Sequence, residues 1–248
     1  MLVAAAVCPC PPLLVPEVAA GAAPELDAAR VACAQALDGL AAARPDRLVV
    51  IGPAGPGEAG VYPQGASGSF SGYGVAGDLR LGKHGETTAA PETHARRLPA
   101  SLAVAAWLLD RAGWDAAPVE GLAIDPLLPP ERCGETGREL AAGPSRTALL
   151  ITGDGSACRT LKAPGYLDER AAAFDAAAAR ALGAADSAAL MAIDASLASE
   201  LKAVGRAPWQ VLAGAAESTR PEGRLLYEDA PYGVGYFVAT WSYASKAR

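Results

Sequence analysis

Three short stretches of this sequence directly follow apolar runs, and two of them carry polar or reactive side chains. They are residues 8–10 (Cys-Pro-Cys), residues 52–55 (Gly-Pro-Ala-Gly) and residues 153–157 (Gly-Asp-Gly-Ser-Ala). An apolar run that ends in glycine and short polar residues is typical of a buried strand that delivers a loop to a site. If the three runs are parallel strands of one sheet, their loops meet in one cleft at the carboxyl ends.

Asp154 and Ser156 admit two interpretations. Short polar side chains after a strand commonly cap the loop or bind its backbone amides, and we favour that role. A nest of backbone amides could instead hold an anion or a small acid, with Arg159 and Lys162 close by in the sequence. A nucleophilic role for Ser156 is not predicted, because the motif contains no histidine and does not spell Gly-x-Ser-x-Gly.

The cysteines offer a second kind of chemistry. Cys8 and Cys10 are two residues apart, so both thiols face the same way on a continuing strand. Together with Cys158 they could form a thiolate site, which would favour zinc or copper(I) over an iron centre that activates oxygen. However, prolines at positions 9, 11 and 12 make this backbone irregular, and structural zinc usually has four converging ligands. We therefore interpret the cysteines as partly buried free thiols.

Histidine is scarce in this chain. The sequence contains two histidines, His84 and His94, in or beside a polar stretch that precedes an expected helix. Neither belongs to the three stretches above, and we expect both on the surface. An iron site with two histidine ligands would require both of them to swing into the cleft.

The elements that would position these stretches alternate along the chain. Residues 52–77 contain nine glycines, which predicts a long loop without regular structure. The pattern predicts a single α/β domain over residues 1–248, with a mostly parallel or mixed central sheet and helices on both faces. Strands are expected at residues 2–7, 47–52, 118–124, 147–152 and 233–241, with a weaker one at 77–81, and helices at 24–43, 98–112, 167–182, 187–193, 195–204 and 208–217.

Composition excludes several classes of partner. The net charge is −6 and the isoelectric point about 5.0, and no basic run exists to neutralise phosphates. We therefore expect neither a nucleic-acid nor a membrane partner. Five cysteines are too few and odd in number for a disulfide framework, which predicts a reducing cytoplasm. The apolar start lacks a basic region and is short, so we interpret it as the first buried strand.

Four motifs in order resemble class III extradiol ring-cleavage dioxygenases of the LigB-like group, including their Memo-type relatives. That group has a His-Pro-Pro turn where residues 10–12 read Cys-Pro-Pro, and Ser-Pro-His-Gly where residues 52–55 read Gly-Pro-Ala-Gly. Its Gly-Asp-Leu-Ser-His loop is matched by residues 153–157, and its Gly-Val-Gly-Tyr strand by residues 233–236. Further agreement comes from Lys162-Ala163-Pro164-Gly165-Tyr166 and Phe174-Asp175.

The resemblance implies an iron site whose histidines this chain lacks. Members of the group hold Fe(II) with two histidines and one carboxylate, and a further histidine moves protons as the ring opens. The two ligand histidines fall on Cys10 and Ala54, and the third falls on Ala157. Alanine can neither bind a metal nor transfer a proton. The carboxylate falls most nearly on Glu200, which could point inward from a helix edge, although an ordinary boundary glutamate is the interpretation we favour.

These observations predict a divergent dioxygenase-like protein that binds a small molecule or an anion, without ring cleavage and without a cofactor. The resemblance also implies homo-oligomers. One alternative is a metal-dependent oxidoreductase that uses Cys10, Asp154 and Glu200 with Fe(II) or zinc. Another is an interaction protein whose cleft has collapsed. The expected binding residues are Cys10, Ala54, Gly55, Asp154, Ser156, Arg159 and Lys162.

Overall fold

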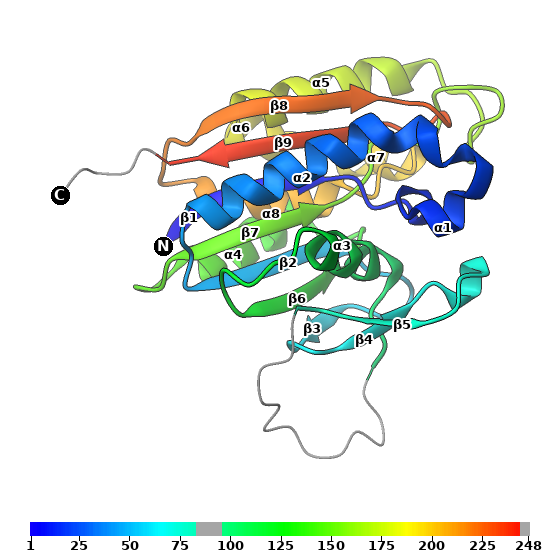
Figure 1. Cartoon of the computed structure of the whole chain (residues 1–248). Helices are drawn as coiled ribbons and strands as arrows, with labels where there is room; N and C mark the ends of the chain where they lie inside the picture. Colours follow the sequence, from blue (N-terminus) through cyan, green and yellow to red (C-terminus); the bar gives the residue numbers. More distant parts are fainter. Residues whose placement is uncertain (83–95, 244–248) are drawn as a thin grey trace.

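A computed structural model describes residues 1–82 and 96–243 of the chain. Its centre is a seven-stranded sheet in the order β3-β6-β2-β7-β1-β9-β8 (Figure 1). The four middle strands are parallel: β6 (Val119–Ile124), β2 (Arg47–Pro53), β7 (Thr147–Thr152) and β1 (Leu2–Cys8). Antiparallel pairing adds β3 (Gly60–Tyr62) to β6, β9 (Tyr236–Ser242) to β1, and β8 (Glu222–Asp229) to β9.

Helices cover both faces of the sheet, which confirms the predicted α/β class with a mixed sheet. One face packs against α2 (Asp27–Ala42) and α3 (Ala100–Arg111), and the other against α4 (Pro130–Ala141), α5 (Arg170–Ala184) and α8 (Arg206–Ala216) (Figure 1). Shorter helices are α1 (Pro16–Ala19), α6 (Ser187–Met191) and α7 (Ala195–Glu200). No helix within the described residues is long and apolar enough to cross a membrane.

Burial on both faces explains why the parallel strand β1 is apolar throughout. In β1, Ala4, Ala6 and Cys8 pack in the layer of α2, whereas Ala5 and Val7 pack in the layer of α5. This alternation is the period of two that a strand imposes on its side chains. A strand covered on both faces has no solvent side, so neither phase of the alternation carries polar residues.

The glycine-rich stretch was predicted to lack regular structure, and this is wrong. It contains β3, a 3-10 helix (Ser71–Tyr73), and β4 (Ser67–Ser69), which pairs with β5 (Asp78–Arg80). Gly68 shows the physical reason, because a Cβ there would lie 3.1 Å from Leu98 Cβ. Glycine at this position permits close packing rather than flexibility.

Outside the glycine-rich stretch, two of the longer elements were not predicted, the helix α4 and the edge strand β8. Helix α4 contains Gly134 and Gly137, which weaken a helical pattern in sequence. In the structure a Cβ on Gly137 would lie 2.0 Å from the carbonyl oxygen of Val211, and one on Gly214 would lie 2.3 Å from the carbonyl oxygen of Gly134. The glycines therefore allow the backbones of α4 and α8 to come into direct contact.

Candidate functional site

A crevice is expected at the carboxyl ends of β1 and β7. The chain leaves β1 toward the layer of α2, through the buried Leu14 and Leu26. It leaves β7 toward the opposite layer, through the buried Cys158 and Ala171. Neighbouring parallel strands whose connections leave to opposite faces open a ligand-binding crevice at their carboxyl ends. We call the group of Cys10, Asp154 and Tyr236 at this place the strand-end crevice.

Asp154 is the acid of the strand-end crevice. Its side chain is partly exposed, and its Oδ1 accepts a hydrogen bond of 2.9 Å from the backbone N–H of Cys10. Its carbonyl oxygen accepts a 2.9 Å bond from the N–H of Gly205. Burial raises the pKa of Asp154 to about 7, against the smaller opposing effect of the Cys10 hydrogen bond. Within residues 1–82 and 96–243, no cationic side chain forms an ion pair with this carboxylate.

Cys10 and Tyr236 supply a thiol and a phenol. Tyr236 opens β9, which runs antiparallel to β1, and its side chain is 2% exposed. Burial, followed by the charge of Asp154, raises the pKa of the Tyr236 phenol and the pKa of the Cys10 thiol. Both groups therefore keep their protons at neutral pH, and Cys10 is neither an activated nucleophile nor a ready thiolate ligand.

The loop that carries Asp154 is also held by the buried carboxylate of Asp175, which contacts Ser156 and Arg159. The Ser156 hydroxyl donates to Asp175 Oδ2 at 2.8 Å, and the Ser156 N–H donates to Asp175 Oδ1 at 2.7 Å. The Arg159 guanidinium lies 3.1 Å from the same Oδ2. Burial raises the pKa of Asp175, although these bonds oppose the shift. Arg159 therefore already has an anionic partner.

Asp154 and Ser156 hold the loops together, but not through amides of their own loop. Asp154 binds an amide on the neighbouring loop, that of Cys10, and the Ser156 hydroxyl binds the carboxylate of Asp175. The physical reason is that both residues lie between packed layers, so partners from other segments come within reach of their short side chains. Their contacts join segments that are distant in the sequence.

Asp175 entered the sequence analysis only through the Phe174-Asp175 match and was not expected to be a site residue, and the same holds for Tyr236 in the match over residues 233–236. Asp175 lies on the buried side of α5 with Ala171, Phe174 and Ala178. A carboxylate in phase with three apolar residues of a helix was the available signal, because a buried acid requires partners. Its partners come from the loop after β7, so the sequence alone does not reveal the contact.

The other residues matched to the dioxygenase group either donate hydrogen bonds through their backbone N–H groups or lie at the surface. The N–H of Ala54 donates to the carbonyl of Ile124 at 2.8 Å, and that of Gly55 to Glu58 Oε2 at 3.0 Å. Ala157 is 9% exposed and donates its N–H to the carbonyl of Leu201 at 2.9 Å. Lys162 is exposed.

Glu200 does not point inward, so the inward alternative drawn from its helical phase is wrong. Its side chain is 52% exposed and forms an ion pair of 2.8 Å with Arg170 at the start of α5. The physical reason is that α7 ends at Glu200, so its side chain can reach a nearby cation. Burying the charged side chain in the core would cost more free energy.

The cysteines do not converge either. Cys8 and Cys10 pack in the layer of α2, as their spacing predicted, but Cys158 packs in the opposite layer with its Sγ 3.5 Å from the carbonyl of Leu201. Among the described residues, no three His, Cys, Asp or Glu side chains are grouped so that they could hold a metal ion. His84 and His94 lie outside the described residues.

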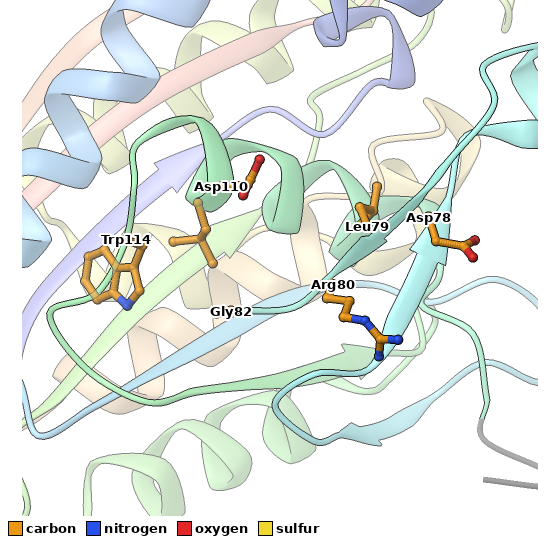
Figure 2. Close-up of a pocket in the computed structure, with 7 residues that line it drawn as sticks. Asp78, Leu79, Arg80, Gly82, Asp110 and Trp114 are labelled. Carbon is orange, nitrogen blue, oxygen red and sulfur yellow. The ribbon is translucent and has the colours of Figure 1, made fainter. Parts of the chain in front are cut away.

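A hollow of about 290 Å³ lies elsewhere, beside β5 and the end of α3. Figure 2 shows Trp114 at one end of it and the β5 residues Asp78, Leu79 and Arg80 toward the other, with Gly82 between them. Arg80 donates to the carbonyl of Gly65, and Asp78 is paired with Arg97. None of the residues that line this hollow belongs to the strand-end crevice.

Comparisons with known proteins place the fold and leave the activity open. No protein-family model matches the chain, and no curated protein sequence matches it. The chain is similar in structure to the uncharacterized protein JW3007 from Escherichia coli K12, with a TM-score of 0.54 and 14% identity. The match covers 97% of this chain and 100% of that protein. At this identity the similarity concerns the fold alone.

Proposed function

We propose that this protein is a divergent relative of the LigB-like class III extradiol dioxygenases that binds a small molecule and does not cleave rings. The observation that carries the proposal is the set of side chains at the three positions matched to histidines. They are the thiol of Cys10 and the methyl groups of Ala54 and Ala157. This donor set does not fit Fe(II), whose oxygen-activating sites use two histidines and one carboxylate.

The strand-end crevice supports the small-molecule part of the proposal. Ligand sites are mostly apolar with a few fixed polar groups, and Asp154 is such a group, held by the N–H of Cys10. An anion has less support than a neutral or cationic ligand. The acid Asp154 would repel an anion, and Arg159 is paired with Asp175.

The metal-dependent oxidoreductase has no observation in its favour. Its three proposed ligands were Cys10, Asp154 and Glu200, and the carboxylate of Glu200 is engaged with Arg170 at the surface. The raised pKa of the Cys10 thiol adds a cost to metal binding, because the thiol must lose its proton before it can bind a metal.

We also assign the protein to a reducing cytoplasm. All five cysteines are free thiols, and all five are buried. Buried free thiols behave as small apolar residues and need no oxidising compartment. Self-association stays a prediction from the resemblance.

The proposal is tested by metal analysis of protein purified without chelator, followed by turnover assays with catechol and protocatechuate after addition of Fe(II). We expect iron well below one equivalent per chain and no ring-opened product. An extradiol dioxygenase with its histidines intact, carried through the same purification and assay, is the positive control. Stoichiometric iron together with ring-opened product would contradict the proposal.

A further inference from the structure

We infer that the strand-end crevice binds a protonated primary amine, and that the carboxylate of Asp154 is the counter-ion of its ammonium group. This inference rests on the proposed small-molecule function and names the class of ligand.

Asp154 is an acid without a cation. Its Oδ1 is satisfied by the N–H of Cys10 at 2.9 Å, and Oδ2 accepts no hydrogen bond from any residue in 1–82 or 96–243. A largely buried carboxylate is costly unless a cation accompanies it. The Cys10 N–H is a neutral donor, so it orients the carboxylate but does not balance its charge.

Three buried or partly buried guanidinium groups of the described residues are engaged elsewhere. Arg159 pairs with Asp175, and Arg30 pairs with Asp27 at 2.6 Å. Arg206 donates to the carbonyls of Pro126 and Leu128. None of these three guanidinium groups therefore balances the ionised form of Asp154, which predominates above about pH 7. A ligand that carries a positive charge would balance it.

Tyr236 and Cys10 give the crevice two further heteroatoms. Tyr236 is 2% exposed and Cys10 is 6% exposed, and neither the phenol nor the thiol forms a hydrogen bond with another of the described residues. An ammonium group has three N–H donors and no acceptor, whereas a carboxylate, a phenol oxygen and a sulfur atom all accept. A carboxylate-bearing ligand would face Asp154 with like charge. A neutral alcohol would leave the charge of Asp154 unbalanced.

The test uses three probes with one carbon skeleton: phenethylamine, 2-phenylethanol and phenylacetate. Their binding is followed by NMR chemical shifts of backbone amides at pH 8, where Asp154 is mostly ionised. We expect phenethylamine to shift the amides of Cys10 and Gly155, and to bind at least tenfold more tightly than the alcohol or the acid.

Asp154→Asn is the decisive variant, because its amide oxygen can still accept the Cys10 N–H while its charge is absent. We expect it to weaken phenethylamine binding at least tenfold. Asp186→Asn is the matched control. It removes the same charge from the exposed N-cap of α6, where asparagine caps equally well, and binding should not change.

Several outcomes overturn the inference. Equal binding of the alcohol, no effect of Asp154→Asn, or no binding of phenethylamine would each do so. The first two would leave the small-molecule function standing, because a ligand would still occupy the crevice. Zinc chloride is titrated in parallel, and zinc binding that disappears in Asp154→Asn would make the crevice a metal site instead.

Discussion

Two effects change the pKa of Asp154 in opposite directions. The hydrogen bond from the Cys10 N–H favours the ionised carboxylate, but burial disfavours its charge and raises the pKa to about 7. In the unfolded chain its pKa returns to the ordinary value of 3.8. The folded state therefore binds more protons than the unfolded state between these two values, and stability falls as the pH rises through that range.

The pH dependence of Asp154→Asn tests this balance. We expect the variant to gain stability relative to wild type between pH 4 and pH 7, by about 2 kcal/mol. This is roughly half the free energy that such a pKa represents for a fully buried acid, because Asp154 is partly exposed. The raised pKa values of Cys10 and Tyr236 keep both groups protonated across this range.

Urea unfolding at pH 5, 6, 7 and 8 measures the effect. The difference between variant and wild type should grow up to pH 7 and then level off. A difference that is constant with pH, or that shrinks as the pH rises, would contradict a raised pKa for Asp154.

Sequence reasoning identified Cys10 and Asp154 of the crevice as binding residues, but neither Tyr236 nor the partners of these groups. Short polar side chains after a strand satisfy groups in their surroundings, which made Asp154 and Ser156 conspicuous. Their partners, like those of Glu200, come from other segments. The contacts of Asp175 with Ser156 and of Glu200 with Arg170 join residues 19 and 30 positions apart. These contacts form only because tertiary packing brings one helix against a loop or against another helix.

At the scale of elements, the contact between α4 and α8 depends on glycine. A methyl group on Gly137 would lie 2.0 Å from the carbonyl of Val211 and 2.5 Å from the N–H of Ala215. Both neighbours are backbone atoms of α8, so they can move only if the whole helix shifts. Close helix contacts of this kind are lost when the small residue grows.

We therefore expect Gly137→Ala to lower the free energy of unfolding by about 3 kcal/mol, through separation of α4 from α8. Gly39→Ala on the exposed side of α2 is the control. Its methyl group would meet no atom within 4 Å, and the higher helix propensity of alanine should stabilise the protein by up to about 1 kcal/mol. Both values come from urea unfolding. A Gly137→Ala protein as stable as wild type would contradict the packing described here.

Some elements of the fold could be predicted from the sequence and others could not. The parallel strands β1, β2, β6 and β7 were predictable because their burial makes them short, mostly apolar runs. Helix α4 was not, because its glycines serve a tertiary contact and weaken the local helical signal. Strand β8 was missed because this edge strand is only partly buried and carries Glu222, Glu228 and Asp229 at exposed positions.

At the scale of the whole molecule, the scaffold and its chemistry are separable. The sheet order brings the loops after β1, β2 and β7 to one edge of the sheet, where ligands usually bind in open α/β folds. The fold does not determine what happens there, and the side chains at these loops do. Cysteine and alanine at the three matched positions are the reason to expect binding without ring cleavage.

The most direct test of this account is crystallography of the protein exposed to Fe(II) without oxygen, with data collected at the iron absorption edge. We expect no anomalous peak within ligand distance of Cys10, Ala54 or Ala157. A strong peak at that place, coordinated by His84 and His94, would contradict the account, because the chain would then hold the iron that its matched positions lack.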